Sequence, residues 1–588
     1  MAVSPARPAR VADETSTPGS PASAGPPGAW ASSVLESMTL EEKAGQLLMP
    51  WMLGDFAPAG SEDFERIAEA VRDDGVGGVI VSVGSPSEVA AKINNLQSLA
   101  KYPLLVGADL ESGAGYRMRG AVFLPNNIEL GGATLFPSLM AVGATGDDSL
   151  AWEMGRVTAV EARAVGVHLP FAPVLDVNNN PDNPVIATRS FGEDPADVAR
   201  LGAAFVRGLQ EHGAIATGKH FPGHGDTGVD SHVDLPVIRV DRERLDRVEL
   251  RPFRAAVDAG MGAVMSAHVS IPSVTGSASM PATLSPAVLS DLLRGEMGFE
   301  GLIVTDAMNM AAITRRFGAR DAVVRALEAG ADIILMPDNP RGARESLVAA
   351  VRSGRVTEAR LDRSVARILD LKERMGLDRE RYTDIFRIHR RVGIPDHLEQ
   401  ATEIAEASIT LLRNRRNLLS LRGTRTANVL SVTYRGRNDL LAGRYFNPRV
   451  RATYRRLRTA DLHSGSGDTE YERLLARASR SDLVIVSAYV VAARTDGQPN
   501  LPEPLSDFVA ALADRRVPHI VISFGNPYLL SDVPEAQAYM LAWSGSEVSQ
   551  VAAARALFGE IPIRGRTPTR LPSLFDIGDG IQLPLRGR

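Results

Sequence analysis

Residues 218–232 read GKHFPGHGDTGVDSH and place a lysine, three histidines and two aspartates within fifteen positions. Three kinds of chemistry use such side chains. Imidazoles and carboxylates bind Zn²⁺, glycine-rich turns bind anions through backbone amides, and an aspartate beside a histidine supports proton transfer. The segment therefore raises three hypotheses: a metal site, a phosphate-binding loop or an acid/base loop.

The spacing disfavours the first two hypotheses. His220 and His224 have the spacing of a helical zinc pair, but Pro222 and the glycines on both sides of His224 disfavour a helix. The nucleotide-binding pattern G-x-x-x-x-G-K-[ST] is absent from this segment. We therefore predict no metal site and no cofactor.

The third hypothesis depends on Asp230 and His232, which are two residues apart. In a turn, the carboxylate can orient the imidazole and stabilise its charged form. A histidine with a pKa near 6.5 can give and accept protons near neutral pH. The alternative is that both are solvated loop residues without a chemical role, and these two residues alone leave it open.

The elements around this segment alternate between short apolar runs and helical-period segments from about residue 36 to 376. Eight such strand-helix units fit a (β/α)8 barrel or a doubly wound open sheet. Polar residues at the carboxyl ends of five runs favour the barrel, because barrel enzymes keep their chemistry at that rim. These residues are Asp109, Asp176, Lys219 with His220, His268 and Asp306. The runs are 46–52, 77–83, 103–110, 167–177, 214–220, 262–269, 301–308 and 331–337.

A second set of apolar runs follows at 427–434, 482–490, 519–525 and 538–545, and predicts a mainly parallel sheet. The overall prediction is an α/β protein: a TIM-like (β/α)8 barrel followed by a smaller α/β domain. The predicted divisions are a disordered Pro/Ala/Ser-rich leader over 1–35, the barrel over 36–380, a linker over 381–400 and the C-terminal domain over 401–588.

The composition narrows the functional class. The 588 residues carry a net charge of -5, which disfavours nucleic-acid binding, and no apolar run is long enough to predict a membrane span. The chain has no cysteine. Its first thirty residues lack the apolar core of a secretory signal, so a cytoplasmic location is the default. An exported protein whose signal precedes this sequence would look the same.

Three segments carry a family resemblance: KHFPGHGDTGVDSH (219–232), NNNPDNPVIATRSFGEDP (178–195) and GLIVTDAMNM (301–310). Together they resemble glycoside hydrolase family 3, in its β-N-acetylglucosaminidase branch, over nearly all of 36–376. The resemblance implies the same barrel. The sequence departs from the family at 109–118, where DLESGAGYRM replaces the usual DxEGGRV; one early arginine is absent, and Arg117 falls where the second would lie.

The resemblance also implies roles for particular residues. Asp306 of TDAM matches the nucleophile, and His232 backed by Asp230 matches the general acid/base. Without the family, Asp306 could equally cap a helix, and Arg189 could pair with Glu193 or Asp194. The residues implied to hold the sugar and its N-acetyl group are Asp109, Arg117, Arg189, Lys219 and His220.

These residues predict a retaining exo-β-N-acetylglucosaminidase that acts on peptidoglycan or chitin fragments through a covalent glycosyl-enzyme on Asp306. One alternative is a β-N-acetylglucosaminide phosphorylase that uses the same residues. A remote alternative is an inactive sugar-binding protein, which the presence of Asp306 and His232 disfavours. The expected partner is a glycan containing N-acetylglucosamine, and the sequence does not indicate an oligomeric state.

Overall fold

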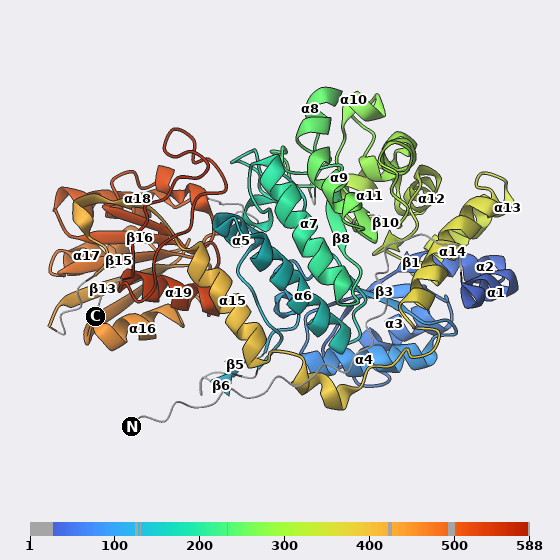
Figure 1. Ribbon diagram of the computed structural model, residues 1–588, viewed down its shortest axis with the longest axis horizontal. Helices are drawn as coiled ribbons and strands as arrows, with labels where there is room; N and C mark the ends of the chain where they lie inside the picture. The colour runs from blue at the N-terminus through green and yellow to red at the C-terminus, as the bar shows by residue number, and fades with distance from the viewer. Residues whose placement is uncertain are drawn as a thin grey trace.

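The computed structural model describes residues 28–120, 131–231, 233–421, 426–491 and 500–585, together with the short strands β5 (Val122–Phe123) and β6 (Ile128–Glu129). His232, the predicted acid/base, lies outside the described residues. A barrel and a smaller α/β unit lie side by side, with α5 (Leu139–Thr145) and α15 (Pro395–Ser408) packed together between them (Figure 1).

A closed ring of parallel strands forms the barrel. The strands pair in the orders β2-β3-β4-β7, β8-β9-β10 and β11-β1. Bridges between Val174 and Lys219 and between Val304 and Ile333 join these groups, and Pro50 alone separates β1 from β2. The ring confirms the predicted (β/α)8 barrel over the open sheet. The strands are β1 Leu48–Met49, β2 Trp51–Leu53, β3 Gly78–Ser82, β4 Leu105–Ala108, β7 Leu169–Pro170, β8 Thr217–Phe221, β9 Ala263–Ser266, β10 Leu302–Val304 and β11 Ile334–Leu335.

Helices cover the outside of the ring, and local sequence signals mark where they begin. Ser85 and Glu88 form a reciprocal capping box at the start of α4, and Asp194 caps α7 ahead of Pro195. The helices of this part are α1 Ala29–Ser37, α2 Leu40–Gln46, α3 Glu62–Arg72, α4 Pro86–Leu99, α6 Asp148–Ala164, α7 Pro195–Glu211, α8 Arg242–Arg247, α9 Leu250–Asp258, α10 Pro272–Thr275, the π-helix η4 Ala287–Glu296, α11 Ala311–Phe317, α12 Ala319–Ala329, α13 Pro340–Arg352 and α14 Glu358–Arg374.

The C-terminal unit is one sheet with the strand order β12-β17-β16-β15-β13-β14. Only the pairing of β12 with β17 is antiparallel among the described strands of this sheet, which confirms the mainly parallel prediction. Its elements are β12 Thr410–Asn414, β13 Asn428–Tyr434, α16 Phe446–Thr453, β14 Arg456–Leu462, α17 Asp468–Ala478, β15 Leu483–Ala488, α18 Glu503–Asp514, β16 His519–Ser523, β17 Ala538–Leu541 and α19 Glu547–Leu557.

Two helices cross the predicted boundaries at residues 35 and 400. Helix α1 lies partly within the predicted leader, because the Glu373 carboxylate accepts hydrogen bonds from the amides of Trp30 and Ala31 at its start. Helix α15 runs across the predicted boundary at residue 400 without a break. Helix α1 packs on α14, and α15 packs on α5 and α19, contacts that local composition does not reveal.

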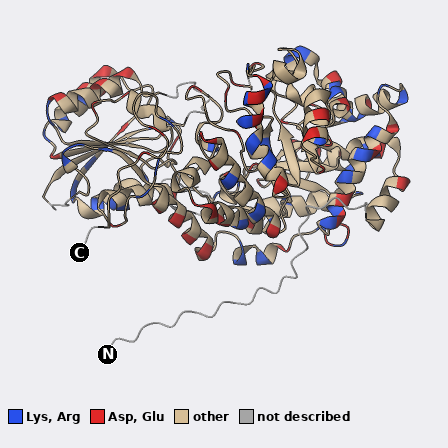
Figure 2. Cartoon of the chain, turned by 45° about the horizontal axis from the view of Figure 1, so that its top comes forward, with Lys and Arg blue, Asp and Glu red and all other residues tan. Residues whose placement is uncertain are grey.

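Acidic and basic side chains are interspersed over both parts of the molecule (Figure 2). Among the residues that the structure describes, no helix combines the length and apolar composition needed to cross a membrane.

Candidate active site

The carboxyl ends of the barrel strands bring together residues that lie far apart in the sequence. Asp109 follows β4, Lys219 and His220 lie in β8, and Asp306 comes two residues after β10. Lys219 is only 2% exposed, and its Nζ donates to Asp109 Oδ1 at 2.8 Å and lies 2.7 Å from Glu111 Oε1. The lysine therefore does not extend to solvent as a strand-end side chain could; it joins buried Glu111 to half-buried Asp109.

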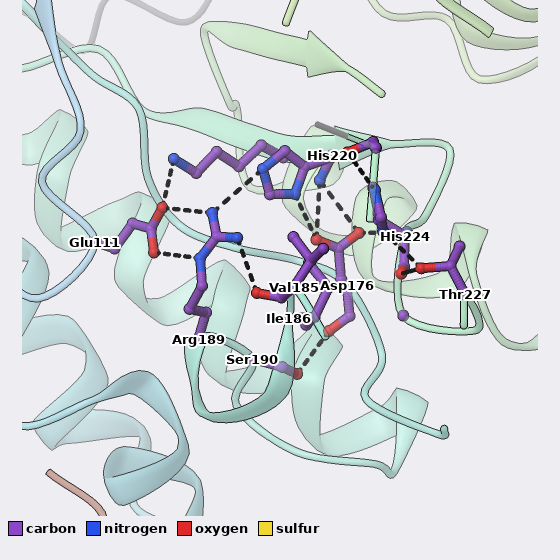
Figure 3. Close-up of polar contacts among 12 residues, drawn as sticks. Glu111, Asp176, Val185, Ile186, Arg189, Ser190, His220, His224 and Thr227 are labelled. Carbon is purple, nitrogen blue, oxygen red and sulfur yellow. Dashed lines mark hydrogen bonds and ion pairs between the residues drawn. The ribbon is translucent and has the colours of Figure 1, made fainter. Parts of the chain in front are cut away.

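Arg189 and Arg117 complete this network of charges. Arg189 donates from Nε and Nη2 to the two oxygens of Glu111 at 2.9 and 2.8 Å, a bidentate pair visible in Figure 3. Arg117 donates to Asp109 Oδ2 at 2.9 Å. The sequence suggested Glu193 or Asp194 as a structural partner for Arg189, and the structure shows Glu111 in that place.

Glu111 was missed by sequence reasoning, although it is the most connected carboxylate of the network. Its position two residues after Asp109, at the end of an apolar strand, was the available signal. Two carboxylates that are two residues apart at the end of a strand lie on the same side of the chain, so both can face the same rim of the barrel. The pairing with Lys219 and Arg189, which lie 108 and 78 positions away, had no local signal.

The network stays charged despite its burial. Burial raises the pKa of Glu111, but Arg189 and Lys219 outweigh this and hold the pKa well below its usual range. Asp109 follows the same pattern: burial raises its pKa, but Lys219 and Arg117 outweigh this and hold the pKa below its ordinary value. Burial lowers the pKa of Lys219, while Asp109 and Glu111 raise it above its ordinary value. These groups thus present fixed donors and acceptors to a ligand that carries hydroxyl groups.

Asp176 orients His220 from beneath the network. Its carboxylate is fully buried and lies 2.7 Å from His220 Nδ1, and it accepts the backbone amides of His220 at 3.2 Å and of His224 at 2.7 Å (Figure 3). Burial raises the pKa of Asp176, but the histidines lower it overall. An ionised Asp176 accepts the Nδ1 hydrogen, so Nε2 of His220 faces Arg189 Nη2, 3.5 Å away, as an acceptor.

Asp306 belongs to the same charged cluster. Its Oδ1 accepts the Ala307 amide at 2.8 Å. Burial raises the pKa of Asp306, but His268, His220 and Lys219 outweigh that and hold it below its ordinary value. The carboxylate is therefore ionised near neutral pH, as a nucleophile requires. His268 is fully buried, with Nδ1 2.8 Å from Thr283 Oγ1 and Nε2 3.0 Å from the Ala307 carbonyl oxygen.

The loop after β8 is held by its own side chains. Nε2 of buried His224 lies 3.0 Å from Ser231 Oγ, and its Nδ1 lies 2.9 Å from Thr227 Oγ1. Burial lowers the pKa of His224 to about 4, so this imidazole is neutral at physiological pH. Through these contacts His224 holds the loop to itself. The carbonyl of Asp230 accepts the amides of Val233 and Asp234, at 2.9 and 3.1 Å, in the turn that follows.

The C-terminal unit contacts the segment that carries Arg189. Tyr528 accepts a hydrogen bond from Asn178 Nδ2 at 2.9 Å and lies 3.0 Å from Thr569 Oγ1. Glu193 accepts the Arg570 amide at 2.7 Å. These contacts attach the C-terminal unit to the segment that carries Arg189.

We expect Tyr528→Phe to raise KM by about threefold to tenfold, the equivalent of about one net hydrogen bond, with kcat little changed. The change frees Asn178 Nδ2 and loosens the segment that holds Arg189. Steady-state kinetics measure both constants. Tyr454→Phe, a buried tyrosine beside Phe558 in the C-terminal unit, is the matched control. Equal KM values for the two variants would contradict this role for Tyr528.

Comparison with protein families decides what kind of enzyme this site belongs to. The model described as "Glycosyl hydrolase family 3 N terminal domain" matches residues 39–371, and "Glycosyl hydrolase family 3 C-terminal domain" matches residues 409–579. The chain belongs to glycoside hydrolase family 3.

This glycoside hydrolase is similar to proteins of known activity over most of its length. It is 31% identical over 562 residues to a "Beta-N-acetylglucosaminidase/beta-glucosidase" of Cellulomonas fimi, with 92% of this chain and 95% of the relative covered. A solved family 3 β-N-acetylglucosaminidase from Paenibacillus sp. str. FPU-7 is 35% identical, with a TM-score of 0.77 and coverage of 91% of this chain and 99% of the other. A solved β-glucoside phosphorylase is 27% identical, with a TM-score of 0.80 and coverage of 92% and 96%.

Proposed function

We propose that this glycoside hydrolase is a retaining exo-β-N-acetylglucosaminidase. The observation that carries the proposal is the convergence of ionised Asp306 with the Asp109–Lys219–Glu111–Arg189 network at one barrel rim. The printed names of the Cellulomonas and Paenibacillus relatives support N-acetylglucosamine as the sugar. The sugar is released from the non-reducing end of a glycan.

In the first half of the reaction, Asp306 attacks the anomeric carbon and forms a covalent glycosyl ester. The bond from the anomeric carbon to the leaving oxygen breaks, and His232 gives its proton to that oxygen. In the second half, His232 takes a proton from water while the water oxygen attacks the same carbon. The ester bond then breaks, Asp306 is released as a carboxylate, and the sugar keeps its β configuration.

The other residues hold the sugar while this happens. Asp109 and Glu111 accept hydrogen bonds, and Lys219, Arg117 and Arg189 donate them. Since every one of these groups already has a partner in the network, their positions are set before substrate arrives. Such preorganisation lowers the cost of orienting the sugar for attack. His220 contributes Nε2, and Asp230 steadies His232.

Phosphorolysis is the second candidate, and the similarity to the solved β-glucoside phosphorylase favours testing it. A neutral imidazole as base repels an incoming phosphate anion less than a carboxylate would. In that reaction, phosphate oxygen attacks the glycosyl ester in place of water and yields a sugar 1-phosphate.

Product analysis with p-nitrophenyl N-acetyl-β-glucosaminide, with and without inorganic phosphate, separates the two reactions. We expect free N-acetylglucosamine as the main product in both conditions, with p-nitrophenol release unchanged by phosphate. Sugar 1-phosphate formed faster than free sugar would replace hydrolysis by phosphorolysis. His232→Ala provides the control with chitobiose, whose sugar leaving group is poor: it slows both reactions, because both need the same proton donor.

For the natural substrate we propose peptidoglycan or chitin fragments. Comparing kcat/KM for a disaccharide muropeptide and for chitobiose distinguishes these sources. We also propose that the barrel of 36–380 and the C-terminal domain of 401–588 act as separate units of one enzyme, with the chemistry in the barrel.

A further inference from the structure

A second cavity lies at the opposite end of the barrel from Asp306. It has a volume of about 510 Å³ and is lined by the end of α6, the residues before β7 and the segment after α14. His168, which lines it, immediately precedes β7, whereas Asp109 and Asp306 follow β4 and β10. Because the strands are parallel, the amino end of β7 and the carboxyl ends of β4 and β10 lie on opposite faces of the barrel.

The lining of this cavity is strongly basic. Its carboxylates, Glu380 and Asp384, already accept hydrogen bonds from the backbone amides of Tyr382 and Phe386, at 3.0 Å each. Asp384 also pairs with Arg387 at 3.1 Å. Against these two carboxylates stand five arginines: Arg163, Arg379, Arg381, Arg387 and Arg391.

Two of these arginines have no side-chain partner among the described residues. Within the part of the chain that the structure describes, neither Arg163 nor Arg391 makes an ion pair or a side-chain hydrogen bond. Arg381 donates to the Ala100 carbonyl at 3.1 Å and keeps its remaining donors. A guanidinium presents five N–H donors, so several donors of this lining are free to bind a ligand.

Two buried bases, Lys372 and His168, lie close to these arginines. Lys372 is fully buried and donates to Gln46 Oε1 at 2.7 Å, and burial together with Arg381 lowers its pKa to about 7. Burial, then Arg163 and Lys372, lower the pKa of His168 well below its ordinary value. Burial also lowers the pKa of Arg163 to about 10. Arg381 thus disfavours the charged form of Lys372, and Arg163 and Lys372 disfavour that of His168, a cost that a bound anion would relieve.

His168 adds a neutral donor to the same surface. Its Nδ1 accepts the Val106 amide at 3.1 Å, so the hydrogen of the neutral ring is on Nε2. The lining thus combines guanidinium forks with an imidazole N–H. Such donors match the planar or tetrahedral oxygens of carboxylates and phosphates.

We propose that this cavity binds a small multivalent oxyanion, held chiefly by Arg163, Arg381 and Arg391. Its volume is in the range of small-molecule sites, and several arginines without matching carboxylates call for more than one negative charge. Polyphosphates and polycarboxylates share this chemistry. The site does not depend on the proposed sugar chemistry, since none of its lining residues belongs to the candidate active site.

Isothermal titration calorimetry of the full chain with pyrophosphate and with citrate, at constant ionic strength, tests the proposal. Saturating N-acetylglucosamine is present throughout to occupy the candidate active site. We expect one anion per chain to bind, and Arg163→Gln and Arg391→Gln each to weaken binding by about tenfold or more. Arg207→Gln, an exposed arginine of α7, is the matched control and should bind like the unchanged protein.

The comparison of pyrophosphate with citrate shows which class of anion the cavity prefers. Tighter binding of pyrophosphate indicates a phosphate-bearing molecule, and tighter binding of citrate indicates a polycarboxylate. Arg391 is exposed, so Arg391→Gln keeps the test valid if Arg163→Gln does not fold. Absence of binding by both anions, or binding that both pocket variants leave unchanged, would overturn the proposal.

Discussion

Asp306→Asn is expected to reduce kcat by roughly 10⁴-fold or more, as the loss of an enzyme nucleophile does. An amide cannot form the glycosyl ester, because its nitrogen and oxygen are poor nucleophiles compared with an ionised carboxylate. The exchange is nearly isosteric, and the amide oxygen can still accept the Ala307 amide that Asp306 Oδ1 accepts at 2.8 Å. The fold should therefore survive. Turnover of p-nitrophenyl N-acetyl-β-glucosaminide measures the loss.

A matched control separates the loss of the nucleophile from the loss of a backbone cap. Asp241 also accepts a backbone amide, that of Arg244 at 2.8 Å, but at the start of α8. Asp241→Asn should leave kcat within about twofold of its original value, since surface changes of this kind cost little.

Asp306→Ala offers a second readout: azide can occupy the vacated space, attack the anomeric carbon and restore turnover of activated substrates. Near-normal kcat in Asp306→Asn would eliminate Asp306 as the nucleophile.

Glu111→Gln is expected to destabilise the protein by about 3–5 kcal/mol and to lower kcat/KM strongly. Glu111 is 4% exposed, and its carboxylate is shared by Arg189 and Lys219. The neutral amide leaves buried Lys219 and half-buried Arg189 with Asp109 as the remaining carboxylate of the network. Both donors should then shift towards Asp109, which moves them away from the sugar. Urea unfolding and steady-state kinetics measure the two effects.

The pH dependence distinguishes this charge effect from a simple packing defect. Because the folded-state pKa of Glu111 is well below the unfolded value, its contribution is present above about pH 4.3 and is lost as pH falls through the folded-state pKa. The unchanged protein should therefore lose stability in acid more steeply than Glu111→Gln. Glu243→Gln, which removes a surface pair with Arg247 3.2 Å away, should cost less than about 1 kcal/mol. A similar small cost for Glu111→Gln would refute the buried network as a major stabilising element.

The barrel itself was predictable from sequence. Its strands are buried on both sides, so they appear as continuous apolar runs, such as the fully buried Gly78–Ser82 of β3. The edge strand β14 was not predicted, because its exposed Arg456 and Arg458 interrupt the apolar pattern. An edge strand has neighbours on one side only and does not need a continuous apolar sequence.

The sequence by itself determined which residues end the strands and, through family motifs, which chemistry to expect of Asp306. Strand-end position is a local property, because a polar residue stops an apolar run wherever the strand leaves the core. Only the tertiary structure decided the partners: Glu111 for Arg189, and Asp176 for His220. Those pairs join residues 78 and 44 positions apart, and local sequence does not encode which charges become neighbours when a ring of strands closes.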